Sequence, residues 1–275
     1  MRANIEEKFL RSMKGSTKKV LSLIIFLFLT IIVNAQEMTE EPENITEKRS
    51  EEWLFSGIVN IGTNGIAIIP AFALRRPGIA AFLNIRKGRF IYRPQFGFGI
   101  EGSPWFFNNC LIYESVKTEK FTLGTGLVWG AGFKRPEIVH NGVMQQVAVG
   151  ERFLWLEVSP EYRFKKNLSL SSRVWYGFNF EEGSADQILF TSVKLNINKI
   201  RLFKPLYLNL QPQLFYLGLD HQEHGFFMFS TAQLGVDRIP VLFTAQINTP
   251  FTHNIEPSPV TLWNFGLTFE LGTIK

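Results

Sequence analysis

The sequence has a single cysteine, Cys110, and so no disulfide can form within the chain. After residue 35 it also has no apolar run long enough to cross a membrane as a helix, which takes roughly 20 residues. The motifs G-x-S-x-G and H-E-x-x-H are both missing. These absences argue against a disulfide-stabilised fold and a helical membrane protein, and they remove the usual signatures of serine hydrolases and zinc peptidases.

Strong charge of one sign is missing as well, once the N-terminus is set aside. Residues 1–35 hold six of the 29 Lys and Arg and two of the 24 Asp and Glu, which leaves 23 basic and 22 acidic residues. The remainder is close to neutral and gives no argument for a nucleic-acid partner. Within the first 35 residues, basic residues precede an apolar run at 21–33 and the small-residue pattern V-N-A at 33–35. This order predicts a cleaved signal peptide over residues 1–35, with a short membrane anchor as the alternative.

Two regions of different composition follow the predicted signal peptide. Residues 36–52 are rich in Glu and have few apolar side chains to bury, so we expect a disordered acidic linker there. Residues 53–275 are rich in Phe and Gly and show no second change of composition. We therefore expect one domain over 53–275.

Strict alternation of apolar and polar residues is the strongest signal in this domain. In residues 263–271 the alternate positions are Trp, Phe, Leu, Phe and Leu, with Asn, Gly, Thr and Glu between them. The alternation recurs at 89–101, 153–165, 167–181, 189–198, 206–216 and 239–248, and more weakly at 66–74, 78–87, 105–116, 121–132 and 225–236. No helical run is present to cover these apolar faces. The pattern predicts an all-β fold, a closed antiparallel transmembrane β-barrel with lipid outside and a polar lumen.

The spacing of the predicted turns sets the strand number. Short turns near 86–88, 117–120, 165–167, 198–204 and 236–238 alternate with longer or more polar loops at 133–151, 181–187, 219–225 and 249–259. Outer-membrane barrels have this asymmetry, and an even strand number places both termini on the periplasmic side. Counting back from the C-terminus predicts about 12 strands beginning near Gly65, with 10 or 14 as alternatives. Residues 54–62 are then left over, to extend the first strand, cap the barrel or enter its lumen.

Charged side chains of both signs fall on the predicted polar face. Besides Arg86, the candidate lumen charges are Arg89, Arg93, Glu101, Glu157, Glu161, Arg163, Arg173, Lys194 and Glu270. One interpretation is a network of ion pairs that fills and stabilises a small barrel. The other is the charged constriction of a diffusion pore. A barrel of about 8 strands is filled by side chains and one of about 16 leaves a channel, so a strand number of 12 does not decide between them.

Three further features have a plain structural interpretation and a functional one. His221 and His224, next to Asp220 and Glu223, could bind a metal or activate water at the rim of the barrel, but we expect solvated loop residues. Cys110 is expected to be a packed side chain. The aromatic run 105–107 is expected in an interfacial belt at the headgroup level. We accordingly expect no catalytic residues, no metal and no cofactor.

The C-terminal strand resembles the outer-membrane β-barrel superfamily of Gram-negative envelopes. Asn264, Gly266, Phe269 and Leu271 match the pattern polar-x-Gly-x-x-apolar-x-apolar, the signal read by the barrel-assembly machinery, although residues 272–275 follow where many members end. With G-x-x-x-I-P at 65–70 and R-P-Q-F-G-F-G-I-E-G-S-P-W at 93–105, the chain is similar to uncharacterised barrels over residues 53–271.

The resemblance implies an outer-membrane location, contact with outer-membrane lipids and assembly by that machinery. It implies no particular substrate. We expect a porin-like passive channel for small solutes or a structural barrel of the envelope. The alternative is a hydrolase at the barrel rim that acts on lipid or peptide.

Overall fold

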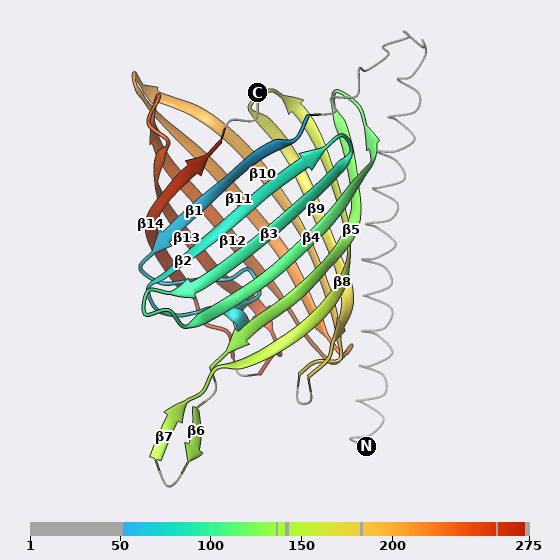
Figure 1. Cartoon of the computed structure of the whole chain (residues 1–275), viewed down its shortest axis with the longest axis vertical. Helices are drawn as coiled ribbons and strands as arrows, with labels where there is room; N and C mark the ends of the chain where they lie inside the picture. Colours follow the sequence, from blue (N-terminus) through green and yellow to red (C-terminus); the bar gives the residue numbers. More distant parts are fainter. Residues whose placement is uncertain (1–51, 136, 141–142, 182–183, 257, 273–275) are drawn as a thin grey trace. The chain divides into compact units, whose positions relative to one another are not determined.

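The computed structural model describes residues 52–272 except for 136, 141–142, 182–183 and 257. Twelve strands form one closed barrel, and each is hydrogen-bonded antiparallel to its neighbours (Figure 1). Among these residues no helix is long and apolar enough to cross a membrane. The predicted fold class is therefore confirmed. The predicted signal peptide and all but Glu52 of the predicted linker lie outside the described residues.

The strands follow one another around the barrel. In chain order they are β1 (Leu54–Gly62), β2 (Gly78–Lys87), β3 (Phe90–Gly99), β4 (Pro104–Lys117), β5 (Phe121–Lys134), β8 (Val149–Lys165), β9 (Leu168–Asn179), β10 (Gln187–Phe203), β11 (Leu206–Leu219), β12 (Glu223–Val236), β13 (Val241–His253) and β14 (Leu262–Leu271). Two short strands, β6 (Glu137–His140) and β7 (Val143–Gln146), form a separate hairpin that projects beyond the end of the barrel (Figure 1). A 3-10 helix, η1 (Pro70–Phe72), lies between β1 and β2.

β1 closes the barrel, because it pairs with β2 on one side and with β14 on the other. The strand number of 12 is as predicted, but the predicted start near Gly65 is wrong, since residues 54–62 are the first strand. The alternation in β1 is blurred. Gly57 lies on the outer face opposite Leu271, and Ile58 lies on the inner face opposite Glu270. An apolar residue inside and a glycine outside remove the signal that identified the other strands.

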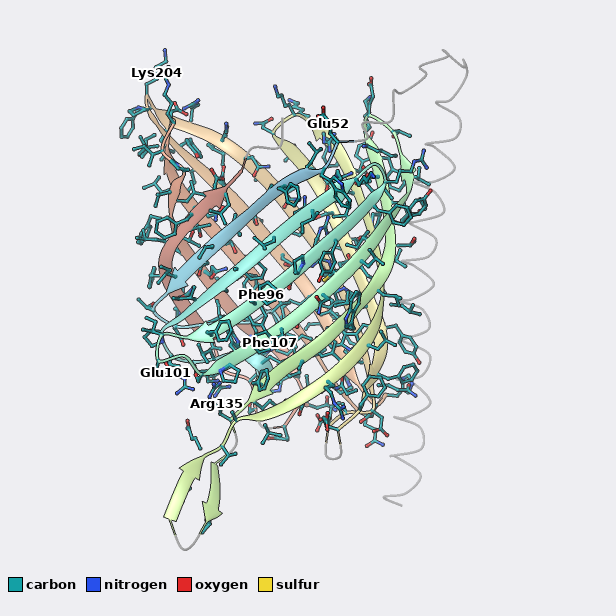
Figure 2. All side chains as sticks on the ribbon, viewed as in Figure 1. Glu52, Phe96, Glu101, Phe107, Arg135 and Lys204 are labelled. Atoms are coloured by element: carbon teal, nitrogen blue, oxygen red, sulfur yellow. The ribbon has the colours of Figure 1, made fainter. Side chains whose placement is uncertain are left out.

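The two ends of the barrel differ in their connections. Glu52 and Lys204 lie at one end, which we call the turn end, and Glu101 and Arg135 lie at the other, which we call the loop end (Figure 2). The β6–β7 hairpin and the β13–β14 loop are at the loop end. The predicted asymmetry is present with two exceptions. The 219–225 connection is a short turn, and 198–204 is mostly the end of β10.

The strand alternation separates an apolar outer face from the lumen. On β14, Trp263 and Phe265 are 55% and 47% exposed, whereas Asn264 is 2% exposed. Aromatic rings also meet across strands on the outer face, as where Phe107 of β4 lies beside Phe96 of β3 (Figure 2). On β14, large apolar side chains outside and polar ones inside have the distribution expected of a barrel surrounded by lipid.

Residues 63–77, the connection from β1 to β2, fold into the lumen, and we call them the inner loop. Ile66, Ile69, Phe72 and Leu74 of this segment are all buried. The strand predicted at 66–74 is therefore wrong. A segment enclosed on all sides is apolar on both of its faces, and a short apolar run of this kind does not distinguish a strand from a packed loop.

Trp105 corrects a second expectation. Instead of lying in an interfacial belt, it is 5% exposed, and its Nε1–H donates a hydrogen bond to the carbonyl oxygen of Phe72 at 2.6 Å. The register of β3 and β4 shifts between Gly97 and Phe98, opposite this residue. A bulge of this kind re-aims side chains, and here Trp105 points at the inner loop.

Candidate functional site

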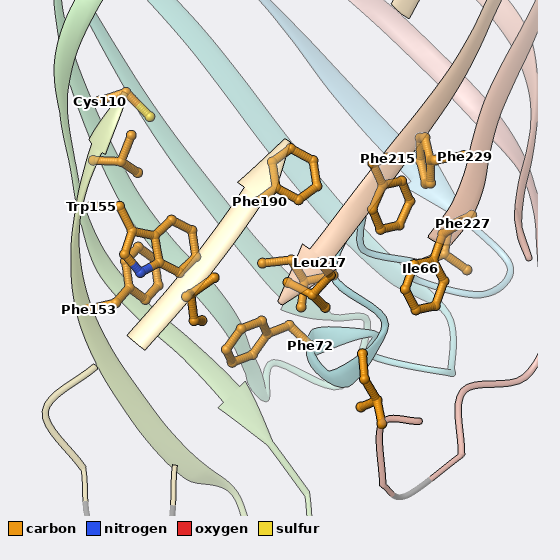
Figure 3. Packing of buried hydrophobic residues seen from close by; sticks show 14 of the residues in the cluster. Ile66, Phe72, Cys110, Phe153, Trp155, Phe190, Phe215, Leu217, Phe227 and Phe229 are labelled. Atoms are coloured by element: carbon orange, nitrogen blue, oxygen red, sulfur yellow. The ribbon is translucent and has the colours of Figure 1, made fainter. Parts of the chain in front are cut away.

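The part of the lumen toward the loop end is packed with aromatic rings. We call this set the aromatic collar; its members are Phe153, Trp155, Phe190, Phe215 and Phe227, which Figure 3 labels, and Trp175, which packs against them. Successive rings around the wall, from β8 to β12, have centroids 4.0 to 5.4 Å apart. Two of the five pairs are stacked and the other three are tilted by 32–35°, and together the rings form a continuous apolar surface.

The inner loop packs against the aromatic collar. Ile66 and Phe72 belong to the same buried cluster as Phe190 and Phe215 (Figure 3). The wall makes room for this contact at Gly132, where a Cβ atom would lie 2.6 Å from the Phe72 ring. The apolar side chains of loop and wall therefore fill this part of the lumen together.

Polar side chains of the wall hold the backbone of the inner loop. The Asn248 side-chain amide donates to the carbonyl oxygens of Ala67 at 2.7 Å and Ile68 at 3.0 Å. The Asn264 Oδ1 accepts a hydrogen bond from the backbone N–H of Asn64 at 3.0 Å. Buried backbone groups need such partners, and here the lumen wall supplies them to a segment that has little regular structure of its own.

Between the inner loop and the turn end, the lumen contains a polar cavity of about 460 Å³. Its cationic lining residues are Arg86, Arg93, Arg163, Arg173 and Lys194, and its carboxylates are Glu114 and Glu161. Neutral polar residues complete the wall, among them Ser169, Ser171, Ser192, Asn196, Gln211 and Gln213. The cavity thus joins side chains from many strands into one charged, hydrogen-bonding surface.

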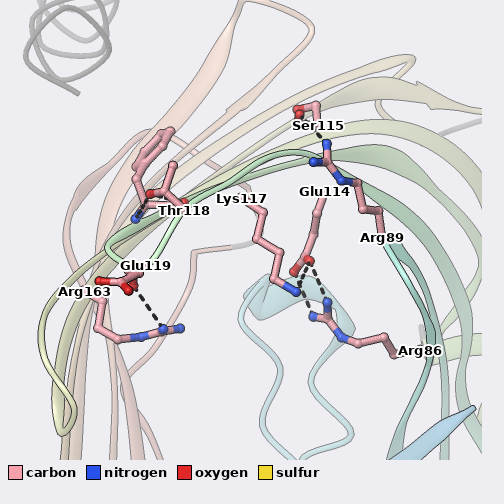
Figure 4. A network of polar contacts seen from close by, with 9 residues as sticks. Arg86, Arg89, Glu114, Ser115, Lys117, Thr118, Glu119 and Arg163 are labelled. Atoms are coloured by element: carbon pink, nitrogen blue, oxygen red, sulfur yellow. Dashed lines mark hydrogen bonds and ion pairs between the residues drawn. The ribbon is translucent and has the colours of Figure 1, made fainter. Parts of the chain in front are cut away.

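One set of ion pairs lies where the cavity meets the turn end. The guanidinium of Arg86 donates to both carboxylate oxygens of Glu114, at 2.6 and 2.8 Å, and the Lys117 ammonium lies 3.8 Å from the same carboxylate (Figure 4). Nearby, Arg163 donates to the carbonyl oxygen of Glu119 at 3.4 Å (Figure 4). Glu114 is neutralised by its neighbours and leaves little negative charge for the cavity.

A second charged group lies inside the lumen, between the cavity and the aromatic collar. Glu157 is 3% exposed and accepts a hydrogen bond from Trp175 Nε1–H at 2.7 Å. Its other oxygen lies 3.5 Å from Nε of Arg173, whose guanidinium is 5.2 Å from the centre of the Trp175 ring. One carboxylate oxygen of Glu157 is therefore hydrogen-bonded, and the other is paired with Arg173 by charge without a hydrogen bond.

The predicted lumen charges fall in two places. Arg93, Glu161, Arg163, Arg173 and Lys194 line the cavity, with Glu157 beside it. The other three lie at the ends of the barrel: Arg89 and Glu270 are exposed at the turn end, and Glu101 is in the β3–β4 turn at the loop end. Glu114 was not among the predicted residues, although its inward position follows from the alternation at 105–116.

Glu101 belongs to a small polar group outside the strands rather than to the lumen. The hydrogen bond from the Ser103 hydroxyl, then the residue's own backbone N–H and the charge of Arg76, hold the pKa of its carboxyl below the usual range. Arg76 also donates to Ser103 at 2.9 Å. This group ties the end of the inner loop to the β3–β4 turn.

The residues of the predicted assembly signal lie in β14, at the closing seam. Asn264 and Gly266 are on the inner side, and Phe269 and Leu271 pair with outward residues of β1. A Cβ atom on Gly266 would lie 2.2 Å from the carbonyl oxygen of Ile61. Glycine at this position therefore permits the close approach of β1 and β14, whatever reads the segment during assembly.

The histidines considered for catalysis do not form a site with Asp220. The Asp220 carboxylate accepts a hydrogen bond from the backbone N–H of Gln187 at 2.8 Å, and His221 is exposed in the turn. Within the described part of the chain, no group of three or more His, Cys, Asp or Glu side chains is placed to hold a metal ion. Cys110 is buried on the inner face of β4.

Comparison with known proteins gives a match in structure but none in sequence. No family model and no curated protein matches the chain. The solved structure of the "KdgM porin in complex with disordered oligogalacturonate" superposes with a TM-score of 0.50 at 8% identity, over 78% of this chain and 99% of that one. The NanC porin covers 78% of this chain and 100% of its own at 9% identity, with a TM-score of 0.47. The chain has the fold of an outer-membrane β-barrel. The superposition on the KdgM porin confirms the predicted barrel class and concerns the fold alone.

Proposed function

We propose that this barrel is a porin-like passive channel for small solutes in the outer membrane, with the inner loop as its gate. The observation that carries the proposal is the polar cavity of about 460 Å³ inside the closed wall. If a network of ion pairs filled the lumen of a purely structural barrel, no such cavity would remain. Here about half of the predicted lumen charges line open space instead.

The inner loop closes the cavity on the side of the loop end. A loop can move, whereas a strand of the wall is held by its ladders on both sides. The inner loop is held by apolar contacts with the aromatic collar and by a few hydrogen bonds, those from Asn248 and Trp105 among them. Its displacement toward the loop end would join the cavity to the outside. In this arrangement the turn end faces the periplasm, as short turns do in barrels of this class.

The proposal includes the partners expected of such a barrel. Outer-membrane lipids contact the apolar outer face, and the barrel-assembly machinery reads Asn264, Gly266, Phe269 and Leu271. The placement of these four residues in the last strand, beside the seam that closes the barrel, supports that role.

Planar-bilayer recording of the refolded protein tests the channel. Leu74 N–H donates to the carbonyl oxygen of Gly65 at 2.7 Å, so the ends of the segment between them are already close. Replacing residues 66–73 by a Gly-Ser turn therefore removes the gate without stretching the chain. We expect rare, brief openings of the native protein and steady conductance of the shortened protein.

The matched control removes the β6–β7 hairpin, residues 137–146, which lies outside the barrel. Its conductance should equal that of the native protein. If the protein with the shortened inner loop folds but gives no conductance above the empty bilayer, the barrel is a closed structural one and the channel is rejected.

A further inference from the structure

The charges of the cavity do not cancel. Arg86 is paired with Glu114, and Arg173 with Glu157. Of the remaining lining charges, Arg93, Arg163 and Lys194 are cationic and only Glu161 is anionic, and none of these four makes an ion pair with a described residue. The cavity therefore has an excess of two positive charges. In a cleft with low-dielectric walls such an excess concentrates anions.

The cations also approach one another. The charges that act on Lys194 include those of Arg173 and Arg93, which come from other strands, and the carboxylate of Glu161 opposes them only in part. Arg93 Nε donates only a long hydrogen bond of 3.3 Å, to a neutral amide oxygen of Asn84. Like charges held close together repel, and an anion between them relieves the repulsion. Arg173 lines the same cavity, and its Nε lies 3.5 Å from the Glu157 carboxylate without a hydrogen bond.

Hydroxyl and amide groups surround these cations. Asn196 Nδ2 donates to the hydroxyls of Ser169 and Ser171, each at 3.2 Å, and Ser192 and Gln213 line the same cavity. Groups of this kind both donate and accept, and so they suit the hydroxyls of a solute. The cavity volume of about 460 Å³ lies within the range of roughly 300–1,000 Å³ found for small-molecule sites.

We propose that this cavity is a binding site for a small hydroxylated anion with a carboxylate or phosphate group. Arg93, Lys194 and Arg173 hold the anionic group, and the serine and amide side chains bind the hydroxyls. The inference deepens the proposed function. It rests on that function only for the role of the site, which is to bind the solute during its passage through the channel. The binding itself depends only on the cavity, so it is measurable without any current.

Titration calorimetry of the full chain, refolded in detergent at fixed ionic strength, tests the site. Three matched solutes are compared: glucose, glucuronate and glucose 6-phosphate. We expect glucose not to bind and at least one of the anions to bind. A preference for one anion identifies whether the site takes a carboxylate or a phosphate.

The test variant combines Arg93→Gln with Lys194→Gln, and the control combines Arg89→Gln with Lys166→Gln. The control removes the same charge from exposed positions at the turn end, outside the cavity lining. We expect the test variant to weaken anion binding at least about tenfold, because charge-assisted hydrogen bonds are lost, and the control to change it less than about twofold. Heat-modifiable migration on a denaturing gel verifies that each variant is folded.

The outcomes separate this inference from the channel. If neither anion binds the native protein, if glucose binds as well as they do, or if the test variant binds as tightly as the control, the site is wrong. Anion binding without conductance of the loop-shortened protein would reject the channel and keep the site. Conductance without anion binding would reject the site alone.

Discussion

The hydroxyl groups of Thr244 and Thr268 lie 2.7 Å apart, and each residue is only 1% exposed. Asn60 Nδ2 donates to the Thr268 hydroxyl at 2.9 Å, so the contact joins β13, β14 and β1 across the seam that closes the barrel. The two threonines are buried, and the amides of Asn60 and Gln233 donate to their hydroxyls.

Replacing both threonines of this group should cost less than the sum of the two single replacements. Thr268→Val leaves Thr244 and Asn60 without their partner and should lower the free energy of unfolding by about 1–3 kcal/mol. Adding Thr244→Val removes one of the two groups that lost their partner. The double variant should therefore be more stable than the sum of the single losses predicts. Urea unfolding in lipid vesicles measures all three; strictly additive losses would show that the hydroxyls are not coupled.

Asn248→Ala should loosen the inner loop. The variant loses two hydrogen bonds to the loop backbone, at Ala67 and Ile68, and about 1–2 kcal/mol corresponds to a roughly five- to thirtyfold greater population of the displaced loop. Single-channel recording should show more frequent openings. Gln233→Ala is the control, because Gln233 bonds only to Thr244 of the wall. Equal opening rates in the two variants would mean that Asn248 does not hold the gate.

Glu157→Ala should destabilise the barrel more than Glu157→Gln does. Alanine leaves Trp175 Nε1–H without an acceptor and Arg173 without its counter-charge, at a cost of about 2 kcal/mol in the free energy of unfolding. Glutamine keeps an acceptor for the indole. Glu119→Ala is the control, since Glu119 is exposed in the β4–β5 turn and its side chain makes no ion pair with a described residue, and it should change stability by less than about 0.5 kcal/mol. Similar losses for all three, measured by urea unfolding in vesicles, would contradict this assignment.

Leu267→Arg tests the lipid-facing surface. Leu267 lies outward within β14, and an arginine near the middle of the bilayer costs about 2–4 kcal/mol in barrels of this class. Phe203→Arg, at the outward turn end of β10, should cost less than about 1 kcal/mol because the headgroup layer is close. The free energy of folding into vesicles measures both. Equal costs would mean that the two positions do not differ in depth.

The alternation predicted the wall of the barrel well, because inward and outward positions experience opposite surroundings. Even weak patterns, such as those at 78–87 and 225–236, correspond to the strands β2 and β12. The prediction failed where a residue's surroundings do not alternate. The inner loop is apolar on all sides, and β1 carries Ile58 inside and Gly57 outside.

The cavity was only partly accessible to sequence reasoning. Alternation places Arg93, Arg173 and Lys194 inside, but it gives no position along the barrel axis relative to the other strands. That position depends on the stagger of the ladders, which decides that Glu114 meets Arg86 and that Glu101 lies beyond the barrel wall. The volume of the cavity also depends on how far the inner loop extends from the loop end into the lumen. No local sequence pattern predicts that depth.

The seam between β1 and β14 has a consequence for the making of the protein. Every other ladder of the barrel joins strands that follow one another along the chain, apart from the β6–β7 hairpin, but this one joins the first strand to the last and pairs Gly57 with Leu271. A nascent or truncated chain that lacks its final strand keeps two open edges, each ready to pair with another polypeptide. The barrel can close only after the whole chain has been delivered to the membrane. Its assembly therefore depends on the ten residues of β14 more than on any residues that line the cavity.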